Sequence, residues 1–181
     1  MKASKFISIS EKVEVFYDEL RQLPNRQRLI KCIHDLTQEG KEDYQVAFSI
    51  LEIDHINRYL DFHGRKEGDH CLQQVTDCMR VLLNGRQGVL GRFSKEQFVC
   101  FLMDISPDTL APLTKNMSEA IENLDLKFCW EQHSFQVTVS VGGVHGLVSQ
   151  FKDKAEMLEI AEEELYQAKS TGYNNVKIKF K

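Results

Sequence analysis

The sequence lacks the features that mark several classes of protein. Its most apolar stretches, 46–50 and 99–103, fall far short of the roughly 20 residues that a membrane-spanning helix needs. The first ten residues hold two lysines but no apolar segment, so we expect no signal peptide. No Gly/Ser linker, internal repeat or low-complexity tract interrupts the 181 residues. We therefore expect one compact domain in the cytoplasm, without a membrane segment.

Cysteine pairs and an excess of positive charge are also missing. The five cysteines include no C-x-x-C pair, and the six histidines form no H-E-x-x-H motif. This disfavours disulfides and metal-binding cysteines, so we expect reduced and mostly buried thiols. Asp and Glu number 27 against 23 Lys and Arg, which gives a net charge of −4 and no general attraction to nucleic acid. Hydrophobic residues at 42% and charged residues at 28% are typical of a globular protein and exclude a disordered chain.

Helical and strand patterns alternate along the chain. Apolar spacing predicts helices near 10–20, 25–39, 54–61, 66–83, 106–123 and 153–170. Strand patterns cover 44–53, 89–93, 98–103, 126–131, 135–144 and 176–180, with one hairpin over 89–103 and a second around His133 and Ser134. This order favours an α+β fold of the ferredoxin-like kind, with a mixed, mostly antiparallel central sheet and helices mainly on one side. A doubly wound parallel fold fits less well, because hairpins force antiparallel pairs.

Acidic residues stand at the ends of two of these strands. Glu52 and Asp54 close the strand over 44–53, and Glu96 lies in the tight turn of the next hairpin. If that strand lies beside the hairpin, Glu52 and Glu96 meet at one edge of the sheet, where two carboxylates can hold Mg²⁺ and, through it, a polyphosphate. Spacing alone favours the plainer alternative, in which acidic residues at strand ends are simply solvated.

Seven short segments, in order, resemble the motifs of GGDEF domains, the diguanylate cyclases of bacteria. They are 18–26 (DELRQLPNR), 52–55 (EIDH), Gly64 with 68–69 (GD), 92–98 (RFSKEQF), 137–142 (VTVSVG), 161–169 (AEEELYQAK) and Gly172. Each piece is weak by itself, but the ordered set is specific. The likeness assigns residues 18–181 to a GGDEF domain, and we expect residues 1–17 to form an N-terminal signalling or linker helix.

The resemblance implies a palm-like sheet, as in nucleotidyl cyclases, that binds GTP with two Mg²⁺. Two such domains face each other and join two GTP molecules into cyclic di-GMP, so a homodimer is among the partners that it implies. It aligns Glu52 and Glu96 with the acidic metal ligands, and Ile53 with a ligand through its backbone carbonyl. The nucleotide-binding positions fall on Asp69 for guanine, Lys169 for phosphate and Arg92 before the signature.

The signature itself departs from the family pattern. It is Ser94, Lys95, Glu96, Gln97 and Phe98 here, where the family has Gly-Gly followed by two acidic residues and Phe. Ser and Lys carry a steric penalty if the turn needs positive φ, and they obstruct close approach of a phosphate to the backbone. Gln97 replaces a carboxylate with a neutral amide. Lys95 either binds a phosphate without a metal ion or is an ordinary solvated lysine, which is the commoner state of a hairpin tip.

Further departures fall on base and phosphate recognition. Leu60 stands where an asparagine reads the guanine edge, and a leucine leaves those polar atoms unmatched, at a cost of about 1–3 kcal/mol. Asn57 replaces a phosphate-binding lysine, and Tyr173 replaces a phosphate-binding arginine. These losses together imply that no catalytic residue set remains competent.

We therefore predict a catalytically inactive GGDEF-like regulatory domain in bacterial cyclic di-GMP signalling. It acts through a protein partner, such as an active cyclase or a cyclic di-GMP phosphodiesterase, and retains weak binding of GTP or a related nucleotide. Mg²⁺ is expected only together with bound GTP. The alternative is an active diguanylate cyclase with an atypical signature, since Glu52 and Glu96 are still acidic. A third interpretation is a nucleotide receptor whose binding needs Lys95 or Lys169.

Overall fold

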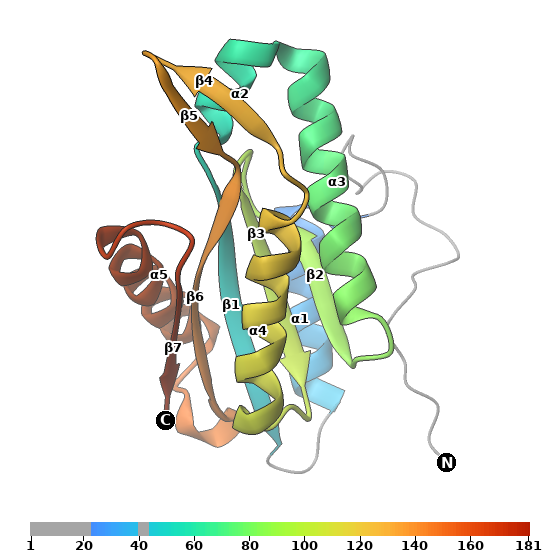
Figure 1. Cartoon of the computed structure of the whole chain (residues 1–181). Coiled ribbons are helices and arrows are strands. Elements are labelled where there is room, and N and C mark those ends of the chain that lie inside the picture. The colour runs from blue at the N-terminus through green and yellow to red at the C-terminus, as the bar shows by residue number, and fades with distance from the viewer. Residues whose placement is uncertain (1–22, 40–43) are drawn as a thin grey trace.

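The computed structural model describes residues 23–39 and 44–181 (Figure 1). A five-stranded sheet has the order β2-β3-β1-β6-β7, with β2 Gly88–Arg92, β3 Gln97–Met103, β1 Gln45–Asp54, β6 Thr138–Leu147 and β7 Val176–Phe180. A separate two-stranded sheet consists of β4 Lys127–Trp130 and β5 His133–Gln136. The helices are α1 Arg26–Glu39, α2 Ile56–His63, α3 Arg65–Leu83, α4 Pro107–Glu122, the 3₁₀ turn η1 Val148–Gln150 and α5 Lys154–Ser170.

Pairing within the large sheet is mixed and mostly antiparallel. Strand β1 lies between β3 and β6 and is antiparallel to both, and β2 is antiparallel to β3. The edge strand β7 runs parallel to β6. This confirms the predicted α+β architecture and excludes the doubly wound parallel alternative. It also confirms that β1 lies directly beside the β2–β3 hairpin.

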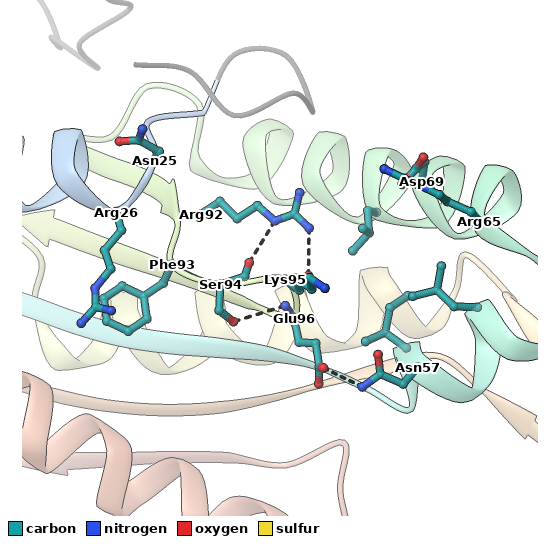
Figure 2. Close-up of a pocket in the computed structure, with 13 residues that line it drawn as sticks. Asn25, Arg26, Asn57, Arg65, Asp69, Arg92, Phe93, Ser94, Lys95 and Glu96 are labelled. Atoms are coloured by element: carbon teal, nitrogen blue, oxygen red, sulfur yellow. Dashed lines mark hydrogen bonds between the residues drawn. The ribbon is translucent and has the colours of Figure 1, made fainter. Parts of the chain in front are cut away.

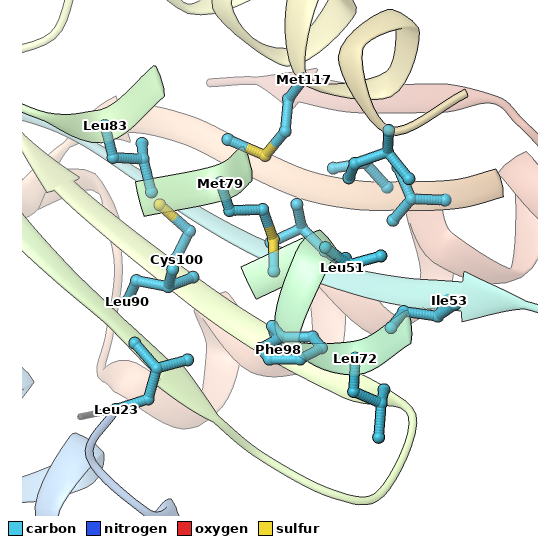
Figure 3. Close-up of a cluster of buried hydrophobic side chains, with 14 of the residues drawn as sticks. Leu23, Leu51, Ile53, Leu72, Met79, Leu83, Leu90, Phe98, Cys100 and Met117 are labelled. Carbon is cyan, nitrogen blue, oxygen red and sulfur yellow. The ribbon is translucent and has the colours of Figure 1, made fainter. Parts of the chain in front are cut away.

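Helices cover both faces of the sheet, so the expectation that they lie mainly on one side is wrong. Ala47 and Leu51 of β1 belong to a buried cluster with α3 and α4, and Figure 3 shows Met79 of α3 beside Leu51 in that cluster. Phe48 and Ile50 belong to a second cluster with α1 and α5. The cause is visible in the strand itself, because the interior of β1 is buried almost without a break, as in strands that are covered on both faces.

The second hairpin also differs from the prediction. Its two-residue turn is Glu131 and Gln132, with φ of 49° and 74°, and not His133 and Ser134. The strand predicted over 135–144 is two strands, since β5 ends before Val137 and β6 begins after it. The alternation of apolar residues continues through this point, although the chain there leaves the small sheet and enters the large one.

Two predicted helix starts are confirmed with their capping bonds. Asn25 Oδ1 accepts a hydrogen bond from the Arg28 amide at 3.1 Å, and Asp153 Oδ1 accepts one from the Glu156 amide at 2.9 Å. The helix predicted near 10–20 lies outside the described residues, and so does residue 40, at which the helix from Asn25 was expected to stop. Across 23–39 and 44–181, the helices are too short or too polar to cross a lipid bilayer.

Candidate functional site

The end of β1 and the tip of the β2–β3 hairpin meet at one edge of the sheet. The register pairs Glu52 with Gln97, and the amide of Ile53 donates a hydrogen bond to the carbonyl oxygen of Glu96 at 2.9 Å. The two acidic residues are therefore neighbours along the paired backbones. Their side chains, however, have different hydrogen-bond partners.

An open cavity of about 1070 Å³ lies above this tip, between the starts of α1 and α3 and the helix α2 (Figure 2). Five of the site residues assigned from the sequence line it: Asp69, Arg92, Ser94, Lys95 and Glu96. Glu52, Ile53, Gln97 and Lys169 are not among its lining residues, and Phe98 is buried in the core. The predicted site is thus divided into a cavity and a second cluster beside it.

That second cluster is centred on the Glu52 carboxylate. Its Oε2 accepts a hydrogen bond from Gln97 Nε2 at 2.8 Å, and its Oε1 forms an ion pair with the Lys169 ammonium from α5. Burial lowers the pKa of Lys169, but the hydrogen bond and charge of Glu52 outweigh it and leave that pKa raised. Both carboxylate oxygens of Glu52 therefore already accept from donor groups of the protein itself.

Glu96 is engaged in a different way. Its Oε1 accepts a hydrogen bond from Asn57 Nδ2 of α2 at 2.6 Å (Figure 2). Within the described part of the chain, no three His, Cys, Asp or Glu side chains come together as a metal site. Because one ammonium and two amide groups already bind these carboxylates, the residues as arranged do not fit Mg²⁺.

The hairpin tip is held together by its own side chains. Arg92 Nε donates to the carbonyl oxygen of Ser94 and Arg92 Nη2 to that of Lys95, each at 2.9 Å. Ser94 Oγ accepts from the amides of Glu96 and Gln97, at 3.3 and 3.2 Å. The tip amides that Ser94 binds are thus already hydrogen-bonded within the turn.

The expected steric penalty at the tip is not observed. Neither Ser94 nor Lys95 is among the described residues that have positive φ. The turn has taken a form that ordinary residues adopt, and the Ser94 hydroxyl stabilises it. The expected obstruction of a phosphate is retained, because the backbone amides of Glu96 and Gln97 donate to the Ser94 hydroxyl.

The wall of the cavity next to Asp69 is apolar. Leu60 of α2 packs directly on Gly68 of α3, so closely that a Cβ added to Gly68 would lie 1.9 Å from Leu60 Cδ2. Leu60 therefore places methyl groups beside the start of α3, where the resemblance expects an amide. A base bound at Asp69 would meet an apolar surface on this side.

Two arginines that line the cavity carried no predicted role. Arg26 lies 4.4 Å from the centre of the Phe93 ring and lines the cavity, as does Arg65. Both stand at helix starts remote from the signature in sequence. Arg26 ends the segment 18–26 that resembles the family, but the likeness assigned it no role, and Arg65 lies in none of the seven segments. Beside the second cluster, Tyr173 packs on His55 with ring centroids 4.6 Å apart, and burial lowers the pKa of His55.

Asp54 is a structural residue. It is buried, and its carboxylate accepts hydrogen bonds from Thr138 Oγ1 and Ser140 Oγ, each at 2.8 Å, and from the amide of Asn174 at 3.0 Å. These bonds tie β1 to β6 and to the loop before β7. Such a fully bonded carboxylate holds the sheet together and has no remaining role in the cavity.

With this geometry in place, comparison with known proteins identifies the class. The family described as "Diguanylate cyclase, GGDEF domain" matches residues 15–175. The match covers most of the chain, and the chain therefore belongs to the GGDEF family. The domain type is one of cyclic di-GMP signalling.

Individual relatives are distant. The diguanylate cyclase DgcP of Pseudomonas aeruginosa is 25% identical over 89% of this chain and 23% of its own length. The cyclic di-GMP phosphodiesterase NbdA of the same species is 27% identical over 88% of this chain and 20% of its own length. The chain spans about half or less of the length of the curated relatives that it matches.

A solved structure has the same fold. The GGDEF domain of DgcB from Caulobacter crescentus, crystallised with c-di-GMP, superposes with a TM-score of 0.75 over 93% of this chain and 98% of that domain. The sequence identity is 20%. The likeness at this identity establishes the fold, and the palm-like sheet expected from the resemblance is confirmed.

Proposed function

We propose that this GGDEF domain is catalytically inactive and regulates cyclic di-GMP signalling through a protein partner. The observation that carries the proposal is the engagement of both acidic side chains. Glu52 binds Lys169 and Gln97, and Glu96 binds Asn57, so each carboxylate is used inside the protein. Removing one general acid or base typically lowers a rate by about 10²–10⁴-fold, and the family carboxylate at position 97 is an amide here.

Residual nucleotide binding is part of the same proposal. Asp69, Arg92 and Lys95 line one cavity, which is large enough for a nucleotide. Lys169 would contribute only after leaving Glu52. Nucleotide binding would not depend on Mg²⁺, and any Mg²⁺ at the site would come with the phosphates of bound GTP, because the carboxylates accept from protein donors instead.

Two relatives support the kind of partner that we propose. Segments similar to this chain form 23% of a cyclase and 20% of a phosphodiesterase, so similar segments are parts of longer proteins of both kinds. We propose an active cyclase or a cyclic di-GMP phosphodiesterase as the partner, in the cytoplasm. A homodimer is a further arrangement that the family likeness suggests.

An active cyclase is the second candidate. Its support is that Glu52 and Glu96 are both acidic and lie beside the same backbone hydrogen bond, from Ile53 to Glu96. For this function, Lys169 and Asn57 would have to leave the carboxylates when GTP enters.

Incubation with GTP and Mg²⁺, followed by chromatography for cyclic di-GMP, separates the two candidates. We expect no product above the level of a protein-free sample, with an active cyclase run in parallel as the positive control. Turnover at the rate of that control would overturn the proposal of inactivity.

The regulatory part has its own test. Rates of a cyclase and of a cyclic di-GMP phosphodiesterase are measured with and without the purified domain. A change in either rate that scales with the domain concentration supports the regulatory function, and unchanged rates for both enzymes contradict the choice of partner.

A further inference from the structure

The cavity carries more positive than negative charge. Its lining includes four basic residues, Arg26, Arg65, Arg92 and Lys95, but only two acidic ones, Asp69 and Glu96. An excess of charge of one sign along the lining of a hollow raises the local potential and attracts ions of the opposite sign. The cavity is therefore suited to an anionic ligand.

Three of these cations are paired with no carboxylate of the residues that the structure describes. Among the described residues, Arg26, Arg65 and Lys95 form no ion pair. Arg26 is instead stacked on Phe93, which holds its guanidinium at the cavity wall. These side chains come from α1, α3 and the hairpin tip, so they line one cavity only in the folded protein, with Arg26 and Arg65 at opposite ends of it and Lys95 between them (Figure 2).

The two carboxylates near the cavity do not supply a metal site. Glu96 accepts from Asn57, and Glu52 lies outside the lining with Lys169 and Gln97 as its partners. A triphosphate in the cavity would therefore contact the positively charged side chains that line it. Neither Glu52 nor Glu96 would be free to bind a metal ion beside it. Lysine and arginine neutralise phosphate directly, lysine as a compact charge and arginine through paired donors.

We propose that this cavity binds a nucleoside triphosphate without a divalent cation, with Lys95, Arg26 and Arg65 supplying the positive charge. The inference deepens the proposed function, because it names the ligand class of a site that no longer cyclises GTP. Lys95 occupies the second position of the altered signature. Its ammonium takes the place of Mg²⁺ as a positive charge beside the phosphates. Nucleotide binding in turn serves as an input to regulation.

The test is calorimetry of the whole chain with GTP, once in EDTA and once with Mg²⁺. We expect affinities that agree within about threefold between the two conditions, and inorganic tripolyphosphate should compete in EDTA. Lys95→Ala should weaken binding about tenfold in EDTA, since one charged hydrogen bond to phosphate is lost, whereas Lys95→Arg should retain most of it. Arg26→Ala should weaken binding to a similar or smaller degree.

The matched control is Lys179→Ala, which removes an exposed lysine from β7, an element that does not line the cavity. It should bind GTP like the unmodified chain, and thermal unfolding verifies that each variant is folded. Binding that disappears in EDTA, absence of binding in both conditions, or equal affinities for Lys95→Ala and Lys179→Ala would each overturn the inference. Production of cyclic di-GMP would instead contradict the proposed inactivity, so the two failures are distinguishable.

Discussion

Glu52 and Glu96 lie at adjoining backbone positions, yet their surroundings have little in common. The side chain of Glu52 is only 14% exposed and is directed to α5, where it meets an ammonium and an amide. Glu96 stands at the rim of an open cavity and has one amide partner, from α2. The comparison teaches that a carboxylate at a strand end becomes a structural or a binding group according to the donors that the fold brings to it.

The largest loss of stability is expected from removing the Lys169 ammonium, the cation of the second cluster around Glu52. Lys169→Met leaves Glu52 with Gln97 alone and should lower the free energy of unfolding by about 2 kcal/mol, between the values for surface and buried pairs. Denaturant titration at neutral pH measures this difference. A loss below that of an exposed pair would show that Glu52 is as solvated as Glu96.

The contribution of Lys169 to the free energy of unfolding should depend on pH. The pKa of Lys169 is raised above its ordinary value of 10.5, so its contribution to stability is complete below that pH and is lost as pH rises through the folded-state pKa. The stability difference between the unmodified chain and Lys169→Met should stay constant near neutral pH and shrink above about pH 10.5. A difference that stays constant through that range would contradict the ion pair.

Replacing the amide donor by a carboxylate tests the cluster from its other side. Gln97→Glu places a second carboxylate next to that of Glu52. The repulsion should lower the free energy of unfolding by about 1–2 kcal/mol at neutral pH, with Lys169 compensating in part. The cost should vanish as pH falls toward about 4, because a protonated Glu at position 97 again donates to Glu52. Mg²⁺ should raise the melting temperature of this variant more than that of the unmodified chain.

At the cavity wall, the effect of one substitution on stability should change sign with the residue at position 60. Gly68→Ala should destabilise by about 1 kcal/mol, because its Cβ meets Leu60 and this overpacking exceeds the gain in helix propensity. In a Leu60→Ala background the same substitution should stabilise the domain instead. Equal effects in both backgrounds would show that Leu60 does not cover Gly68.

The smallest effect is expected at the cavity rim. Asn57→Asp is the counterpart of Gln97→Glu, since it too turns an amide donor into a carboxylate facing a glutamate. Because this pair is exposed, water screens the repulsion, and the cost should be about 0.5 kcal/mol or less. A loss as large as that of Gln97→Glu would remove the distinction between the two acidic sites.

Much of the fold followed from local patterns. The caps Asn25 and Asp153 depend only on neighbouring residues, and within the described residues the helices and strands lie close to their predicted ranges, apart from the strand predicted over 135–144, which is divided. The faces of the sheet did not follow, although the continuous apolar run in β1 was the available signal. The division at Val137 has no local signal, because one alternation serves two sheets.

The sequence by itself determined the order of elements, the acidic positions 52 and 96, and the loss of a carboxylate at Gln97. Only the tertiary structure decided which donors reach those acids and which cations face the cavity. Lys169 meets Glu52 across 117 positions, and Arg26, Arg65 and Lys95 line one cavity from three separate elements. The physical reason is that capping and periodicity act over a few residues, whereas a charge is neutralised by whatever partner the packed helices bring within a few ångströms.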